Sequence, residues 1–182
     1  MRSRRIALRA VLGAAAWVAL SAHSPYGQWG TFRKSRLIVF ADAEDPRSQE
    51  LAGALAGRIA GAVPASGATW ARAPGALQLV KLLASHQADV ILLPSDLAVR
   101  ARAGEAPFAE VGALPIVALA ASAGFLLLSL DEYPEVWAWQ LARALAAEEL
   151  PDGPISLHPG VSAYRSGKPM PASERLDGRQ GQ

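Results

Sequence analysis

The stretch ADVILLPSDLAVRARAG, residues 88–104, contains an uninterrupted apolar run that ends at a proline and is followed by a helix-like pattern. All residues of Val90–Leu93 are apolar, so both faces of this strand would be apolar. This is typical of a strand that is covered on both faces in a parallel sheet. Ser95 and Asp96 are residue types that begin helices, and Gly104 is one that ends them. The stretch therefore predicts a central strand that turns directly into a helix.

The segments on both sides of this stretch continue the alternation of strands and helices. Apolar runs predict strands at 36–40, 68–72 and 90–93, and two further apolar segments lie at 111–119 and 124–130, with Ala120–Ala123 as their connection. Apolar residues at helical spacing predict helices at 46–63, 74–84, 95–102 and 134–150. Strands and helices that alternate with short turns predict right-handed crossovers and an α/β three-layer sandwich with a mostly parallel sheet.

The first 24 residues differ in composition from the rest of the chain. Arginines at positions 2, 4, 5 and 9 precede an uncharged, alanine-rich run, which is typical of an export signal. Removing these four arginines from the 18 basic residues leaves 14 against 16 acidic ones, so the net charge of +2 becomes −2. The rest of the chain therefore carries no excess of basic residues. Because nucleic-acid binding would need a basic surface, we expect no nucleic-acid partner. The absence of cysteine excludes disulfides and thiolate chemistry.

Residues 1–30 are therefore predicted to be an export signal or an N-terminal membrane anchor. Ser3–Arg9 approximates a twin-arginine signal, so the twin-arginine and the general export routes both remain open. An anchor would associate with the membrane through residues 6–24, because no formal charge occurs between Arg9 and Arg33 and about 20 apolar residues span a bilayer. Both alternatives predict a periplasmic chain, either released or held at the inner membrane.

Small and polar residues follow each of the first three predicted strands. Because ligands of open α/β sheets bind at the carboxyl edge, we expect these loops to form a site for a small anionic solute, without a cofactor or a metal. A helix that begins near Ser95 would favour an anion through its dipole and its free N–H groups. The predicted ligand-binding residues are Asp42, Ala43, Arg72, Gly75, Ser95 and Asp96.

Some of these residues also have explanations that require no ligand. Ser95 could be the N-cap of its helix, and Asp96 could complement the helix dipole. Asp42, Glu44 and Asp45 could hold a hard cation. Their spacing is not that of an EF-hand loop, and Asp45 is expected to cap a helix, which favours a solvated loop.

Two segments resemble the solute-binding subunits of TAXI-type TRAP transporters. The first is ADVILLPSDLA, residues 88–98, with Gly104 after it, and the second is LHPGVSAY, residues 157–164. Their order in an exported α/β chain strengthens the resemblance. It implies a periplasmic-binding-protein-like fold, a solute site at the carboxyl edge and a membrane transporter subunit as partner.

Members of that family have two lobes that close on the solute. The second lobe is inserted after the segment that ends here at Gly104, yet only a short segment separates Gly104 from Gly124. The resemblance therefore implies a single lobe, residues 31–165, followed by a disordered tail, residues 166–182. Small-molecule sites usually bury most of their ligand, so we expect a lone lobe to bind a solute weakly or to assist a transporter.

No pattern in the sequence predicts an enzyme. We find no nucleophile elbow, no phosphate-binding glycine loop and no paired carboxylates on facing elements. His158 is expected to pack in the lobe, because no second ligand or base is placed to complete a site with it. The alternative function is a non-catalytic periplasmic interaction module that uses the lobe as a scaffold and Trp137 or Trp139 as an exposed anchor.

Overall fold

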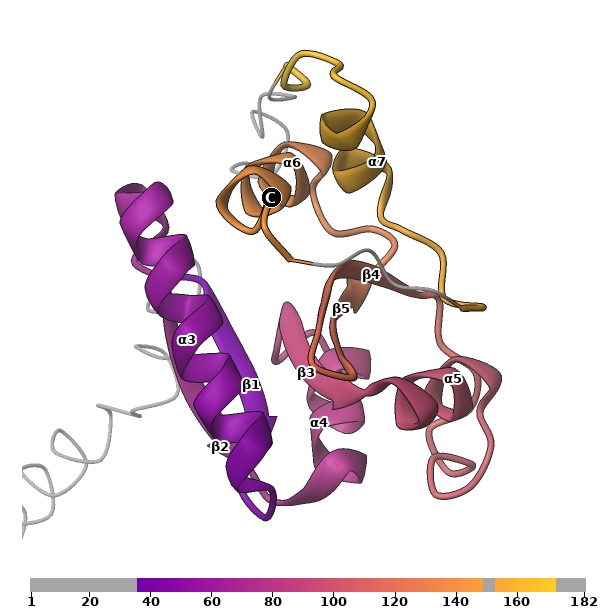
Figure 1. Ribbon diagram of the computed structural model, residues 1–182. Helices are drawn as coiled ribbons and strands as arrows, with labels where there is room; N and C mark the ends of the chain where they lie inside the picture. Colours follow the sequence, from indigo (N-terminus) through magenta and orange to yellow (C-terminus); the bar gives the residue numbers. More distant parts are fainter. Residues whose placement is uncertain (1–35, 149–152, 173–182) are drawn as a thin grey trace, which may run out of the picture. The chain divides into compact units, whose positions relative to one another are not determined.

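Figure 1 shows a computed structural model of the chain, which describes residues 36–148 and 153–172. The predicted signal or anchor, residues 1–30, and residues 173–182 of the predicted tail lie outside the described residues. In the described part, the strands form a five-stranded sheet in the order β2, β1, β3, β5, β4. Within the same residues, no helix combines the length and the apolarity needed to cross a bilayer.

The first half of the described chain is the predicted unit of three strands and two helices. Its elements are β1 (Ile38–Asp42), α3 (Pro46–Ala62), the short 3-10 helix η1 (Pro64–Ser66), β2 (Thr69–Ala73), α4 (Gly75–Ala84) and β3 (Val90–Pro94). Strand β1 pairs in parallel with both β2 and β3. Asp45 caps α3 as expected, because its side chain accepts the N–H of Arg47 at 2.9 Å. This part of the fold prediction is confirmed.

The second half turns the sheet into a mixed one. Its elements are α5 (Ser95–Ala103), β4 (Ile116–Ser122), β5 (Phe125–Leu130), α6 (Glu135–Ala144) and α7 (Pro159–Arg165). Strand β5 runs antiparallel to β3, and β4 runs antiparallel to β5. The sheet is therefore parallel across β2, β1 and β3, and the remaining two strands form an antiparallel hairpin.

The connection between β4 and β5 is shorter than the sequence predicts. Ala120 and Ala121 do not form a loop but pair with Leu127 and Leu126. The turn consists of Ala123 and Gly124, with φ angles of 51° and 83°. Two consecutive residues with positive φ match the twist of a tight hairpin. The alanines belong to the strand because the leucines opposite them supply the bulk that a strand pair needs.

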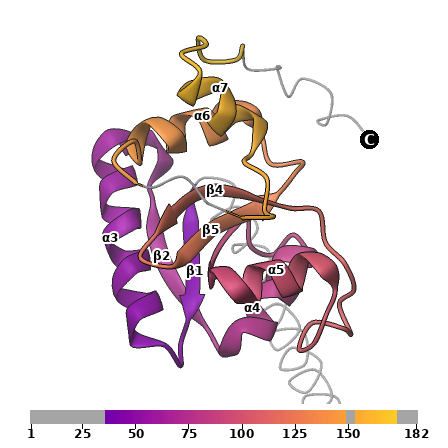
Figure 2. The ribbon, with the colours of Figure 1, turned by 45° about the vertical axis from the view of Figure 1, so that its right-hand side comes forward.

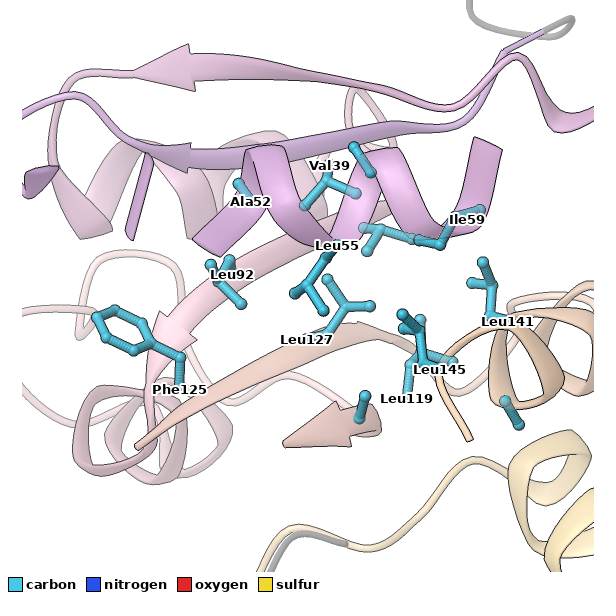
Figure 3. Close-up of a cluster of buried hydrophobic side chains, with 14 of the residues drawn as sticks. Val39, Ala52, Leu55, Ile59, Leu92, Leu119, Phe125, Leu127, Leu141 and Leu145 are labelled. Carbon is cyan, nitrogen blue, oxygen red and sulfur yellow. The ribbon is translucent and has the colours of Figure 1, made fainter. Parts of the chain in front are cut away.

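The central strands of the sheet are buried on both faces, which makes the three predicted layers. Helices α3, α6 and α7 cover one face, and α4 and α5 cover the other (Figures 1 and 2). Figure 3 shows the first core, where residues of α3, α6 and the sheet meet: Val39, Leu55, Ile59, Leu92, Leu127 and Leu141. The second core contains Leu79, Leu83, Ile91, Leu93, Phe108 and Leu128. Alternating residues of β3 thus point into different cores.

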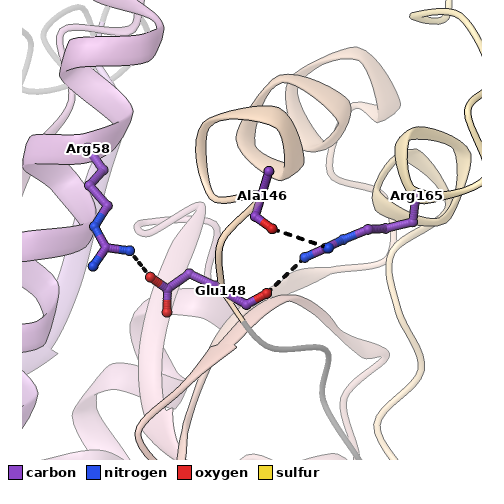
Figure 4. A network of polar contacts seen from close by, with 4 residues as sticks. All are labelled: Arg58, Ala146, Glu148 and Arg165. Atoms are coloured by element: carbon purple, nitrogen blue, oxygen red, sulfur yellow. Dashed lines mark hydrogen bonds and ion pairs between the residues drawn. The ribbon is translucent and has the colours of Figure 1, made fainter.

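Helix α6 ends at Ala144 and not near Leu150 as the periodicity predicts. The backbone carbonyls beyond this end are satisfied from α7, since Arg165 donates to the carbonyl oxygens of Ala146 at 3.3 Å and Glu148 at 2.9 Å (Figure 4). The Glu148 carboxylate in turn forms an ion pair with Arg58 of α3. Helices α3 and α7 are therefore both tied to the segment that follows α6, by contacts that a local helical pattern does not reveal.

The central position of β3 gives a first prediction. The side chain of Ile91 is fully buried, between Phe40 of β1 and Leu128 of β5 in the sheet register. We expect Ile91→Asp to lower the free energy of unfolding by about 3–5 kcal/mol, because it buries an unpaired charge. The measurement is urea unfolding followed by circular dichroism. Val99→Asp is the control, since Val99 is 37% exposed on α5 and should tolerate the charge. Equal midpoints for the two variants would contradict the central placement of β3.

Candidate functional site

The loops after β1 and β2 and the end of β3 lie at the carboxyl edge of the parallel part of the sheet. In the register of β1 and β2, Asp42 is opposite Ala73. The Ala43 N–H donates to the carbonyl oxygen of Ala73 at 2.9 Å, so the first two loops are bonded to each other. Strand β3 continues into α5 without a loop, and its end meets the β4–β5 hairpin, because Pro94 pairs with Phe125. The structure thus gathers elements that are far apart in the sequence at one edge.

Asp42 joins the first loop to the start of α4. Its carboxylate oxygen Oδ1 accepts the N–H of Glu44 at 2.8 Å and the N–H of Gly75 at 3.2 Å. Its own N–H donates to the hydroxyl of Ser48, a buried residue of α3. Asp42 and Gly75, both predicted site residues, are therefore brought together. The carboxylate takes the position at the helix N-terminus that an anionic ligand would otherwise occupy.

Ser95 has a different role from the predicted cap. Pro94 is the N-cap of α5 and makes no side-chain capping bond, and Ser95 is the first helical residue. The backbone N–H and the hydroxyl of Ser95 both donate to the carbonyl oxygen of Gly124, each at 3.0 Å. The prediction that Ser95 caps the helix is therefore wrong, because the hairpin turn offers its hydroxyl a tertiary acceptor. Asp96 is exposed in the first turn of α5.

Ala43 and Arg72 are exposed, and the contacts of Arg72 lead away from the other loops. The Ala43 carbonyl accepts from the side chain of Gln49 at 3.0 Å. The guanidinium carbon of Arg72 lies 5.8 Å from the ring centroid of Trp70 on the same strand. Trp70 lies over α3 at Gly53, where a Cβ atom would be 3.4 Å from the indole nitrogen. Arg72 is therefore placed for a cation–π contact on β2.

The charges of the edge loops do not form a basic surface. The acidic residues here are Asp42 at the end of β1, Glu44 and Asp45 in the loop that follows, and Asp96 in the first turn of α5. The basic residues near them are Arg47 and Arg72. Arg47 lies with its guanidinium carbon 6.0 Å from the Phe125 ring centroid. An anionic solute would meet these carboxylates, so we expect its affinity for this edge to be low.

A second surface feature lies away from the carboxyl edge, where the C-terminal segment packs on the last two helices. It is an open groove of about 710 Å³. Its lining consists of Glu135, Pro159, Ser162, Ala163, Ser166, Lys168, Pro169 and Pro171. The sequence pattern did not predict α7, so this groove was not expected. The signal was present in His158-Pro159-Gly160, where a side-chain acceptor precedes a proline at the first helical position.

The two tryptophans of α6 differ in environment. Trp139 packs edge-on against Tyr164 of α7, with ring centroids 5.2 Å apart, and its indole N–H donates to the carbonyl of Lys168 at 3.2 Å. These contacts extend the folded part beyond the predicted boundary at residue 165. Trp137 is 41% exposed. Of the two predicted anchors, Trp137 therefore offers the larger free surface.

The role of Asp42 gives a second prediction. We expect Asp42→Ala to lower the free energy of unfolding by about 1–2 kcal/mol, because two backbone donors lose a charged acceptor. Asp42→Asn keeps an oxygen acceptor and should lose less than half of that amount. Asp96→Ala is the matched control and should stay within about 0.5 kcal/mol of the wild type. Thermal unfolding monitored by circular dichroism measures all three, and a loss for Asp96→Ala equal to that for Asp42→Ala would contradict this role.

The chain was compared with protein-family models, with curated proteins and with solved structures, and none of the three comparisons gives a match.

Proposed function

We propose that this chain is the single lobe of an exported solute-binding-like protein, which binds a small anionic solute weakly at the carboxyl edge or assists a membrane transporter. The observation that supports the proposal most is the bonding between the edge loops through Asp42 and Ser95. Loops tied to each other and to a rigid sheet lose little conformational entropy when a ligand binds. The ligand would thus meet a surface that is already formed.

Two features of the edge limit the affinity that we propose. The Asp42 carboxylate already uses the first N–H of α4, which leaves the start of α5 as the helix terminus open to an anionic group. Asp96 carries a negative charge in that same first turn. A lone lobe also leaves the far side of a ligand in water, and a hydrated ligand forfeits much of its burial energy.

Calorimetry with the purified chain and a panel of small mono- and dicarboxylates tests this function. We expect dissociation constants no lower than about 10 µM, equivalent to roughly −7 kcal/mol. Ser95→Trp should abolish binding by filling the edge, whereas Ser95→Thr keeps the hydroxyl and should preserve it. Val99→Trp adds the same bulk to an exposed position of α5 and is the control. Binding that survives Ser95→Trp would exclude this site, and submicromolar binding would mean that a second copy or a partner completes it.

A second candidate function is a non-catalytic interaction module, and the exposure of Trp137 favours it. An indole that is 41% exposed on α6 presents a large amphipathic surface, and tryptophan is enriched among the residues that dominate protein interfaces. In this proposal the carboxyl-edge contacts only stabilise the lobe, and a periplasmic protein with no part in transport binds to α6.

The two candidates differ in what a crosslinker on α6 should find. A photoreactive residue at position 137 of the exported full chain should give one discrete adduct with a periplasmic protein, because an interface residue stays close to its partner. The same residue at position 99, on α5, should give none. Absence of an adduct at 137, together with solute binding in the calorimeter, would exclude the interaction module.

A further inference from the structure

His158 is a buried titratable side chain that neither candidate function uses. None of its surface is exposed to solvent. Its backbone N–H donates to the carbonyl oxygen of Ala118 at 2.9 Å, and the preceding Leu157 forms a parallel bridge with the same residue of β4. The residue is therefore fixed at the point where the chain leaves the sheet and enters α7.

The two ring nitrogens of His158 have partners of opposite polarity. Nδ1 accepts the backbone N–H of Gly160 at 3.1 Å, which makes the imidazole the N-cap of α7. Nε2 lies 2.7 Å from the carbonyl oxygen of Tyr133, which can only accept a hydrogen bond. Both contacts are satisfied only when Nε2 carries the proton and Nδ1 carries none. The geometry thus requires the neutral Nε2–H tautomer.

The backbone around Gly160 leaves no room for an alternative arrangement. A Cβ atom at this position would lie 2.3 Å from the carbonyl oxygen of Glu135 and 3.0 Å from the Cβ of Ala138. The first turn of α7 therefore lies directly against the backbone of α6. A second proton, on Nδ1, would point at the N–H of Gly160, so that two donors would face each other across 3.1 Å.

Burial and the carboxylates near the ring shift the pKa of His158 in opposite directions. Burial lowers the pKa of His158 from its usual value, and it outweighs the Tyr133 carbonyl and the carboxylates of Glu135 and Asp131, which act in the opposite direction. The phenol of Tyr133, edge-on to the imidazole at 6.0 Å between ring centroids, has its pKa raised by burial and by Asp89 and stays uncharged. On the sheet side, β4 packs against His158 and contributes the carbonyl of Ala118, which accepts the backbone N–H of His158.

We propose that His158 is a pH-sensitive latch, in which protonation of Nδ1 removes the N-cap of α7 and releases α7 from α6. Four residues that line the α6–α7 groove, Pro159, Ser162, Ala163 and Ser166, lie on α7 or directly after it. Release of the helix therefore removes one wall of that groove. The latch responds to acidification whether or not the chain binds a solute at the carboxyl edge.

The direction of the pH dependence follows from the lowered pKa. The unlatched chain takes up a proton on His158 near its ordinary pKa of about 6.5, whereas the latched chain takes it up only at lower pH. The contribution of the latch is therefore complete above about pH 6.5 and is lost as the pH falls from there through the lower pKa of the folded state. Acidification opens the latch, and neutralisation closes it.

Nuclear magnetic resonance on the full chain tests the proposal with two readouts. Long-range proton–nitrogen spectra of the imidazoles should show the Nε2–H tautomer for His158 at pH 7.5. Hydrogen exchange, corrected for its intrinsic pH dependence, should show that the protection of the α7 amides falls between pH 7.5 and pH 5, by up to about thirtyfold, which is the limit that an ordinary histidine pKa of about 6.5 sets for one lowered pKa. The amides of α4 should keep their protection.

Two variants complete the test. His158→Asn keeps a side-chain acceptor for an N-cap but cannot titrate, so its α7 protection should be the same at both pH values. His86→Asn is the control, because His86 lies at the surface, 2.9 Å from Glu132, and its loss should leave the α7 response unchanged. Since asparagine is shorter than histidine, the wild-type measurement decides by itself. An α7 helix that stays protected at pH 5, with His158 either cationic or neutral, would overturn the latch.

Discussion

The whole fold depends on one requirement, which is that β3 must be covered on both faces. Its four apolar residues alternate between two cores, Val90 and Leu92 toward α3, and Ile91 and Leu93 toward α4 and α5. Neither core alone could bury this strand, so helices must cross both faces of the sheet. The apolar strand ends where the helices no longer cover it, at the carboxyl edge of the sheet. The position of the loops is thus a consequence of where apolar burial ends.

The sequence was informative where local pattern and tertiary burial agree. The alternation of short apolar runs with helical periodicity predicted β1 to β3 and the helices between them, because each of these elements buries its own apolar face. Predictions failed where a distant partner decides the local structure. The Ser95 hydroxyl does not cap α5 but donates to the carbonyl oxygen of Gly124. Helix α6 ends earlier than predicted, and Arg165 donates to a carbonyl oxygen of the segment that follows it. The helix α7 was missed because histidine is an uncommon cap and its acceptor role appears only when Tyr133 fixes the tautomer.

The candidate site shows the same limit. The sequence could predict which loops meet at the carboxyl edge, since parallel strands determine that. It could not predict that the polar groups of these loops would bond to one another. Asp42 and Ser95 look like ligand-binding residues in the sequence, but in the fold each first satisfies backbone groups of a neighbouring loop. Buried and half-buried polar groups form hydrogen bonds within the protein, so a ligand can bind only to the polar groups that these bonds leave unused.

The strand order also has a consequence for the chain while it is being made. Strand β3 lies between β1, which precedes it, and β5, which is synthesised only after α5 and β4. On the ribosome, the unit that ends at Pro94 therefore appears before the hairpin that covers the other edge of β3. During that interval an entirely apolar strand presents unpaired N–H and C=O groups, a combination that promotes association between chains. Association between chains through this edge is therefore favoured until β5 is available to pair with β3.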